Sequence, residues 1–454
     1  MQSFAKKHID PLVQLTIPLI LTGLIQSISY LIINVFLAKL GEEIFAAGAL
    51  VIWMESTLVV IFFGTLGSVS ILTAHKHGAR DEIAIAAICR DGLLLSLILG
   101  IVFFYVYRNL SSLFLLFGQS PAIIGYADHF LKALSWGLFP TFAAIVLLEI
   151  IIGLGDSRLV LIFNILLAIF NVLFGYIFIF GKFGLPPLGI TGAGWAVTVT
   201  QSLAFLIFVF YMLNHRQYRT YLKNMMVNKN SSYLWEIIKI GLPLGLMYSI
   251  EVGFFFALTL CMGAININAL AANQVVMQYL GLAGSICFSI AQAITVRMGF
   301  LIGANEIEDA KKVTIIGMTF AFIIMLIAAL SYLFNPLFFI SLILNVDESN
   351  QTTIHYAVGF LILCGLFQIL ESIRISLFGS LRALKDTGFS MLTSIISFWL
   401  LALPIGYWLA NYTNVGPYGF WLAIIASVLI NIFLLSLRVR AKVYNLKITS
   451  VQYF

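Results

Sequence analysis

Four acidic side chains lie inside long apolar runs of this 454-residue sequence: Glu55, Glu149, Glu251 and Glu371. A charged side chain at the centre of a bilayer costs about 2.5–3.5 kcal/mol on insertion scales, so such groups usually line a cavity or pair with one another. A carboxyl group in such a place can carry a proton or hold Na⁺. The chemistry that these residues predict is the binding and release of a small cation.

Glu251 has the position best suited to that chemistry. It lies 14 residues into an apolar run that begins near residue 237, which is about 21 Å deep at 1.5 Å per residue. Pro243, eight residues earlier, permits a bend in the same helix. We expect Glu251 to bind the coupling ion, Na⁺ or H⁺. The alternative is a neutral, hydrogen-bonded acid that only joins helices.

Glu371 is the second candidate for ion coupling, and it has a basic neighbour. Arg374 lies three residues later and therefore on the same helix face, which predicts an ion pair. Arg374 would then keep Glu371 charged, release it during a transport cycle, or face an anionic ligand. For Glu55 and Glu149 we favour satisfied polar contacts over a role in coupling.

Uncharged polar residues supply candidates for the lining of a substrate cavity. Such side chains join helices as often as they contact a ligand. The chain also has 39 Phe and 18 Tyr, whose rings could receive flat organic cations. With Arg374, the cavity-lining candidates are Gln26, Asn34, Asn171, Gln274, Gln278 and Gln368.

The elements that carry these residues must be membrane helices. The chain is 61% hydrophobic and 10% charged, whereas soluble proteins have about 25% charged residues. Runs of about 20 apolar residues span a bilayer as helices. The sequence therefore predicts an all-α integral membrane protein with twelve transmembrane helices, at 12–38, 44–72, 91–110, 127–152, 158–180, 190–213, 237–263, 268–296, 313–335, 352–381, 388–411 and 416–438.

The chain repeats itself. Pro18, Gln26 and Gly78 recur 225 residues later as Pro243, Glu251 and Gly303, and the turn "GLGDS" (153–157) recurs as "ALKDT" (383–387). We expect the Asp of each turn to cap the following helix. Six spans per half predict two six-helix lobes, 1–213 and 237–454, joined by a cytoplasmic linker, 214–236. A pseudo-two-fold axis along the membrane normal would relate them.

Charge sets the expected orientation. The Lys and Arg residues gather in the two tails and in alternate loops, which places both termini in the cytoplasm. The net charge of +6 is therefore a topology signal and indicates no nucleic-acid partner. We expect a monomer in the cell inner membrane that contacts lipid, needs no cofactor and has no metal site beyond Na⁺ at Glu251.

Several segments resemble the multidrug and toxic compound extrusion (MATE) transporters, in particular their NorM-like branch. They are "GLPLGLMYSIEVGFFFALTLCMG" (241–263), "SIAQAITVRMGFLIGAN" (289–305), "FIFGKFGLPPLGITGAG" (178–194) and "GLFQILES" (365–372) with "GSLRALKDT" (379–387). The resemblance implies efflux of cationic aromatic compounds by alternating access, driven by inward Na⁺ or H⁺. It also implies an antiporter, which is not an enzyme.

The resemblance further implies which residues couple transport to the ion. Glu251 and Glu371 match the family's coupling positions, with Glu371 in place of the usual Asp. Asn34 replaces the acid of the first span, and Gly175 replaces the acid that follows Asn171. These departures predict that the C-terminal lobe alone carries the coupling ion.

Two other functions remain open from the sequence. One is a flippase for lipid-linked oligosaccharides of the same superfamily, which would need a cationic cleft. The other is an intramembrane enzyme, for which the spans show no nucleophile-and-base or metal-ligand spacing. The natural substrate, the choice between Na⁺ and H⁺, and the oligomeric state are not predicted by the residues.

Overall fold

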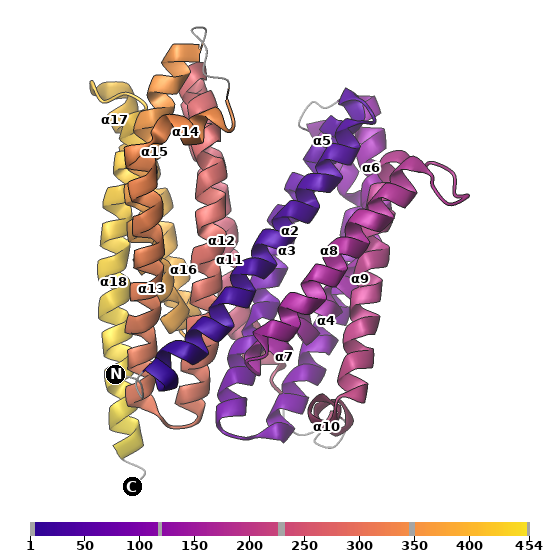
Figure 1. Cartoon of the computed structure of the whole chain (residues 1–454), viewed down its shortest axis with the longest axis vertical. Helices are drawn as coiled ribbons and strands as arrows, with labels where there is room; N and C mark the ends of the chain where they lie inside the picture. Colours follow the sequence, from indigo (N-terminus) through magenta and orange to yellow (C-terminus); the bar gives the residue numbers. More distant parts are fainter. Residues whose placement is uncertain (1–4, 117–119, 226–231, 345–349, 452–454) are drawn as a thin grey trace. The chain divides into compact units, whose positions relative to one another are not determined.

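The computed structural model describes residues 5–116, 120–225, 232–344 and 350–451, which form helices joined by short turns, with no strand among them (Figure 1). The predicted all-α fold is confirmed. The long helices are α2 (Asp10–Ala38), α3 (Glu42–Gly78), α4 (Glu82–Asn109), α8 (Ser157–Phe180), α9 (Gly189–Asn214), α11 (Leu234–Ile265), α12 (Ile267–Gly303), α13 (Ile307–Phe334), α15 (Gln351–Ala383) and α18 (Tyr418–Val451).

The number of membrane spans agrees with the expected twelve once a broken helix is considered. Among the described residues, eleven helices are long and apolar enough to cross a bilayer, and a twelfth span is formed if a bent pair is counted as one. That pair is α6 (Pro121–Ser135) and α7 (Leu138–Gly153), which meet at 51° where the sequence predicts a single span, 127–152. The protein is a multi-pass membrane protein.

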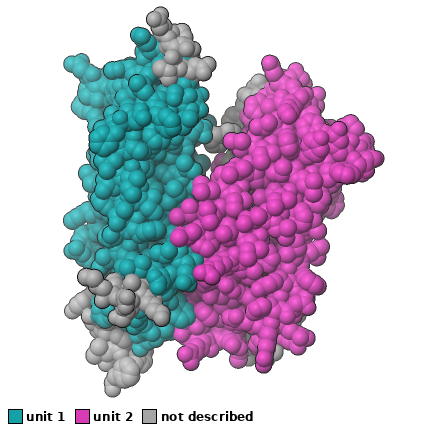
Figure 2. Space-filling view, in the orientation of Figure 1, with its two compact units in different colours: residues 1–16, 246–454 teal, residues 17–245 magenta. Residues whose placement is uncertain are grey.

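The chain divides into two compact units, coloured separately in Figure 2: residues 17–245, and residues 1–16 with 246–454. The division falls inside α2, next to Pro18, and inside α11, just after Pro243. The first turns of α2 therefore belong to the unit of residues 246–454, and the first turns of α11 belong to the unit of residues 17–245. The predicted lobe boundaries at 213 and 237 stay predictions, and part of the linker, 226–231, lies outside the described residues.

In the unit of residues 17–245, α7 is the central helix. It packs against α3, α4 and α9. Its sequence is apolar on every side, as expected for a helix surrounded by others. The short amphipathic α10 (Arg216–Asn224) packs on α4 and α9 and buries Tyr218 and Tyr221. The hydroxyl of Tyr218 donates a 2.6 Å hydrogen bond to Asp156.

In the unit that contains residues 246–454, α15 takes the central place and packs against α12, α13 and α18. Large aromatic side chains fill the core around it. Burying each of them removes roughly 150–250 Å² from solvent, so this cluster contributes much of the packing energy. Its fully buried members include Phe254, Phe360, Phe367, Phe398, Phe420 and Trp421.

The predicted duplication extends to backbone conformation. The turn after α3 has Arg80 at φ 56°, and the turn after α12 has Asn305, 225 residues later, at φ 63°. The turns after α7 and α15 have Gly155 at φ 88° and Lys385 at φ 58°, 230 residues apart. Each turn closes its helix with the same pattern of backbone hydrogen bonds, and a left-handed residue at this position is a common helix ending.

The expected capping role of the two repeated aspartates is wrong. Asp156 and Asp386 stand at the N-caps of α8 and α16 (Thr387–Ser394), but neither side chain bonds to the cap. Instead, Asp156 accepts from Tyr218, and Asp386 accepts from Nε of Arg438 at 2.7 Å. Stronger donors supplied by the tertiary structure replace the local backbone donors.

Candidate coupling-ion site

The predicted coupling residues meet in the unit that contains residues 246–454. Helix α11 carries Glu251 beyond its internal proline, and α15 carries Glu371 and Arg374 on one face, as their spacing predicts. The side chains of Glu251, Glu371 and Arg374 are 10%, 13% and 2% exposed. Two carboxylates and one guanidinium are thus enclosed together in a largely apolar protein interior.

Arg374 bridges the two carboxylates. Its Nη1 and Nη2 donate to the two oxygens of Glu251 at 2.8 and 3.2 Å. Its Nη2 and Nε donate to the two oxygens of Glu371 at 2.5 and 2.7 Å. All four carboxylate oxygens therefore receive an N–H group from one guanidinium. The predicted pair of Glu371 and Arg374 is present, and Glu251 joins it, which the sequence did not indicate.

The helix that follows α15 completes the cluster. Ser394, at the end of α16, donates to Oε1 of Glu251 at 2.9 Å. The next eight residues, η4 (Ile395–Ala402), are a π-helix, a conformation often found at functional sites. The ring of Phe398 in this segment lies 5.2 Å from Cζ of Arg374, and Trp399 donates to the carbonyl of Ile250 at 2.9 Å.

Proline gives a physical reason for the wide turns of η4. Pro404 lies near the start of α17 (Leu403–Tyr412). A proline ring clashes with the carbonyl four residues earlier and removes one helical hydrogen bond. The π-helix ends at Ala402, two residues before Pro404, and includes Leu400, the residue four positions before this proline.

The charges of the cluster do not balance. Arginine stays protonated in proteins, so with both carboxylates ionised the cluster Glu251–Arg374–Glu371 has a net charge of −1. Removing one partner of a buried ion pair costs about 3–5 kcal/mol because a charge is left uncompensated. One added monovalent cation would make this cluster neutral. The arrangement is therefore suited to reversible binding of a single cation.

The first half of the chain has a contact equivalent to that between Glu251 and Ser394, but between uncharged side chains. Gln26, equivalent to Glu251 at an offset of 225, donates to Oδ1 of Asn164 at 2.7 Å. Asn164 is equivalent to Ser394 at the offset of 230 that relates the later helices. The positions equivalent to Glu371 and Arg374 are Thr141 and Ala144, which carry no charge.

A second buried cation lies further along α15. Arg382 is 3% exposed, and its Nη2 donates to Gln292 at 2.6 Å while its Nη1 donates to Tyr248 at 3.3 Å. Its Nε has no hydrogen-bond partner among the described residues. The predicted span 352–381 ends one residue before Arg382, whereas the structure places Arg382 within α15 and buries its side chain, as it does that of Arg374.

The other N-terminal candidates belong to the unit of residues 17–245. Asn171 donates to Ser29 at 3.0 Å, and Asn34 is half-buried on α2. Glu55 is half-buried on α3, and Glu149 is buried in the C-terminal part of α7. Gln26 and Asn171 thus join helices in the described structure, and the substrate contacts expected of Gln26, Asn34 and Asn171 stay predictions.

The remaining C-terminal candidates fall into two groups. Gln274 and Gln278 are exposed and four residues apart, so they share one face of α12. Gln368 is buried on α15, and its Nε2 lies 3.3 Å from the sulfur of Cys364. Gln274 and Gln278 are exposed and Gln368 is buried among helices, and the substrate contacts expected of all three stay predictions.

Sequence reasoning missed Ser394, Asn164 and Arg382. A signal for Ser394 was available, because α16 and the start of η4 bury hydroxyl groups at helical spacing. These residues are Thr387, Ser390, Thr393, Ser394 and Ser397. Such a polar stripe on a membrane helix indicates a face that turns away from lipid.

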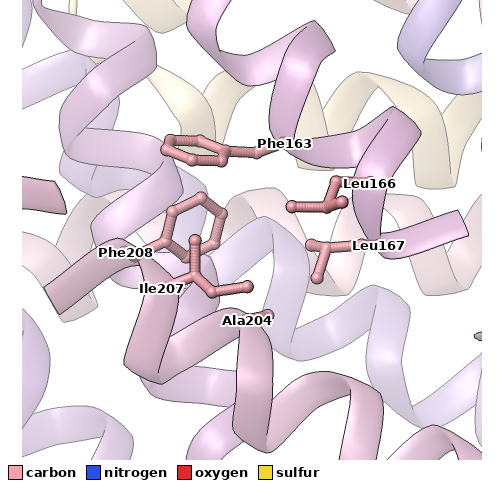
Figure 3. A pocket seen from close by; sticks show the side chains of 6 residues that line it. All are labelled: Phe163, Leu166, Leu167, Ala204, Ile207 and Phe208. Atoms are coloured by element: carbon pink, nitrogen blue, oxygen red, sulfur yellow. The ribbon is translucent and has the colours of Figure 1, made fainter. Parts of the chain in front are cut away.

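A hollow in the unit of residues 17–245 is apolar, unlike the charged cluster of Glu251, Arg374 and Glu371. It lies between α8 and α9 and is lined only by apolar side chains (Figure 3). Side chains without charge or hydrogen-bonding capacity cannot hold a coupling ion. We therefore interpret this hollow as a gap in the packing of α8 against α9. Its lining residues are Phe163, Leu166, Leu167, Ala204, Ile207 and Phe208.

Comparison with known proteins places the chain in a family. The sequence model of the MatE family matches residues 18–177 and 243–408, so its two matches start at Pro18 and Pro243. A probable multidrug resistance protein NorM of Oceanobacillus iheyensis is 29% identical over 423 residues, which cover 92% of this chain and 94% of the relative. The protein of the same name from Brucella suis is 30% identical over 433 residues, 93% of this chain and 91% of the relative.

Solved structures show the same fold. The outward-facing conformation of a multidrug resistance MATE family transporter of the MOP superfamily matches with a TM-score of 0.86 at 22% identity, over 96% of both chains. A MOP superfamily transporter from Pyrococcus furiosus matches with a TM-score of 0.85, also at 22% identity and 96% coverage of both chains. With the matched family model covering most of the chain, this multi-pass membrane protein belongs to the MatE family of transporters.

Proposed function

We propose that this transporter is a cation-coupled antiporter that exports organic compounds, cationic and aromatic, in exchange for H⁺ or Na⁺. The observation that carries the proposal is the buried cluster of Glu251, Arg374 and Glu371, which has a net charge of −1 when both carboxylates are ionised. The name multidrug resistance protein, given to relatives about 30% identical to this chain, supports export of organic compounds. We place the protein in the cell inner membrane as a monomer, with both termini in the cytoplasm.

The charge of the cluster provides a way to couple ion and substrate movement. A ligand shifts a conformational equilibrium only if it binds the two states with different affinity. A coupling cation that enters from outside neutralises the cluster and favours the state that releases the ion inside. The charged cluster favours the state that takes up the next ion. The transporter exports one organic compound each time it changes back to the state that takes up the ion.

Transport by purified protein in liposomes tests the proposal. Efflux of ethidium is followed by fluorescence while a pH gradient or a Na⁺ gradient is imposed. We expect one of these gradients to drive ethidium in the wild type and neither to drive it in Glu251→Gln. Ethidium that moves at the wild-type rate in Glu251→Gln would remove this cluster from the coupling mechanism.

Glu149→Gln is the matched control. Glu149 is also a buried carboxylate, but it lies on α7 in the other compact unit, so we expect this variant to retain gradient-driven transport. A second probe, a chemically distinct organic cation, separates a wrong substrate from a wrong mechanism. Loss of surface polysaccharide in cells without the protein, together with unchanged drug resistance, would instead support the flippase alternative.

A further inference from the structure

The guanidinium of Arg374 lies between the carboxylates of Glu251 and Glu371. Each of the four oxygens of Glu251 and Glu371 already accepts an N–H group from it, at 2.5–3.2 Å. We propose that Arg374 determines the ion specificity of this transporter: it excludes Na⁺ from the carboxylates and leaves H⁺ as the coupling ion. This inference rests on the proposed function, which leaves the coupling ion open.

Coordination chemistry gives the first argument. Na⁺ is a hard cation, and hard cations in proteins are held by several oxygen ligands at once. In this cluster the carboxylate oxygens are directed at the guanidinium, and the hydroxyl of Ser394 is turned towards Glu251 as a donor. Na⁺ would have to displace Arg374, whose side chain is 2% exposed, and leave that charge buried without a partner.

Charge repulsion gives the second argument. If Arg374 stayed in place, Na⁺ bound to either carboxylate would stand beside a second positive charge in a poorly solvated interior, where like charges repel strongly. Arginine cannot relieve this repulsion by losing its proton, because its guanidinium stays charged in proteins. Both possible arrangements therefore disfavour Na⁺.

A proton meets neither obstacle. It forms an O–H bond at one carboxylate oxygen, and the guanidinium loses a single N–H contact there while it keeps the other carboxylate. The net charge changes from −1 to 0. The hydroxyl of Ser394 donates to ionised Glu251 and can accept from the protonated acid, because a hydroxyl group does both.

The described groups on the helices packed against the cluster add no negative charge that would stabilise Na⁺. On the neighbouring helices, the cluster faces Ser394 of α16 and Phe398 of η4. It also faces Cys287 of α12, which interacts electrostatically with Glu371 and Arg374. The next charged group along α15 is Arg382, a further cation, which is bonded to Tyr248 of α11 and Gln292 of α12.

The experiment measures Na⁺ binding and transport separately. Binding of radioactive Na⁺ to the purified protein in detergent is compared for the wild type, Arg374→Gln, and the double variant Glu371→Gln/Arg374→Gln. The double variant keeps the net charge of −1 of the native cluster but has no guanidinium. We expect no saturable Na⁺ binding to the wild type, and saturable binding to both variants that Glu251→Gln abolishes.

If Arg374→Gln does not fold, the double variant still decides the test. The double variant buries one uncompensated carboxylate, whereas Arg374→Gln buries two. Saturable Na⁺ binding to the wild type would overturn the inference, and so would a double variant that folds and still binds no Na⁺. In liposomes we expect a pH gradient, at equal Na⁺, to drive ethidium in the wild type. If neither gradient drives ethidium or the second organic cation, the proposed function is contradicted, while the binding result still decides the role of Arg374.

Discussion

Glu251 accepts a 2.9 Å hydrogen bond from Ser394, 143 residues later in the chain. In the other half, the equivalent positions hold Gln26 and Asn164, which are bonded at 2.7 Å. The duplicated fold thus keeps the same inter-helix contact in both halves. In the second half a carboxylate replaces the amide, and the two positions added to it are Glu371 and Arg374, where the first half has Thr141 and Ala144.

This equivalence predicts the behaviour of a variant that copies the first half. Glu251→Gln/Ser394→Asn should reproduce in the second half the neutral pair of Gln26 and Asn164. Arg374 keeps its bond to Glu371, so the cluster becomes neutral. We expect the variant to insert and fold, with a melting temperature close to that of Glu251→Gln, and to show no gradient-driven ethidium transport. Transport at the wild-type rate would show that the charge of this cluster is not needed.

Removal of Arg374 should be far more harmful to stability than removal of Glu251. Arg374→Gln leaves two ionised carboxylates facing each other, and breaking a buried ion pair in this way costs about 3–5 kcal/mol. After Glu251→Gln, Arg374 still has Glu371 as its partner. Thermal unfolding in detergent should therefore rank the proteins as wild type, Glu251→Gln, Arg374→Gln, from most to least stable.

The control for that ranking is the double variant Glu371→Gln/Arg374→Gln. It removes one of the two facing carboxylates, so it should recover part of the stability lost in Arg374→Gln. Equal melting temperatures for these two variants would indicate that repulsion between Glu251 and Glu371 contributes nothing, and that lost packing of Arg374 against Phe398 explains the whole effect.

Part of this site could be predicted from the sequence. The pair of Glu371 and Arg374 follows from helical spacing alone, and Glu251 was identified by its depth in an apolar run after Pro243. The bond between Arg374 and Glu251 joins residues 123 positions apart, and no local pattern indicates which helices pack together. The π-helix before Pro404 also has no simple sequence signal, since a proline near a helix start is ordinary.

The helices themselves were easier to predict than their ends. Composition and apolar run length indicate membrane spans because lipid leaves no alternative to an intact helix. The break at Trp136 and Gly137 between α6 and α7 was not predicted, although Pro140 lies nearby. Asp156 and Asp386 show the limit of local rules, because their partners Tyr218 and Arg438 come from distant segments.

A close helix contact provides another prediction. Gly241 and Gly245 of α11 form a GxxxG pattern, in which small residues let helix backbones approach closely. A Cβ atom on Gly241 would lie 2.0 Å from the carbonyl oxygen of Thr65 on α3, and one on Gly245 would lie 2.1 Å from that of Ile61. We expect Gly241→Ala to lower the free energy of unfolding by about 1–3 kcal/mol, measured by thermal unfolding in detergent.

Gly281→Ala is the matched control for this contact. Nothing lies within 4 Å of a Cβ atom placed on Gly281, which is also inside a long helix. Alanine is a better helix former than glycine by about 0.8–1.0 kcal/mol, so this variant should be as stable as the wild type or slightly more stable. A stable Gly241→Ala protein would contradict the close packing of α11 on α3.

Alkaline pH should weaken the attachment of α10. Burial and the hydrogen bond to Asp156 raise the pKa of Tyr218 well above its ordinary value. The folded protein then keeps this proton at a pH where the unfolded chain releases it, so the free energy of unfolding falls as the pH rises above about 10. Tyr218→Phe should lose less stability over that range, as followed by thermal unfolding at a series of alkaline pH values.

The control for Tyr218 is Tyr105→Phe. Tyr105 lies on α4 and is 64% exposed, so its removal should leave the alkaline loss of stability as it is in the wild type. If Tyr218→Phe and the wild type lose equal stability, then Tyr218 does not hold its proton in the folded state, and the bond to Asp156 is weaker than its 2.6 Å length indicates.

The equivalent turns after α3 and α12 allow one prediction to be tested twice. Arg80 and Asn305 both have positive φ, at 56° and 63°. A left-handed conformation costs roughly 1–2 kcal/mol for most L-residues, whereas asparagine adopts it more readily. Arg80→Gly should therefore raise the free energy of unfolding by about 1 kcal/mol, and Asn305→Gly should raise it by clearly less. Gly155→Ala, at φ 88°, should lower it. A series in which all three substitutions change stability in the same direction would contradict this account, because the sign depends only on whether glycine enters or leaves a left-handed position.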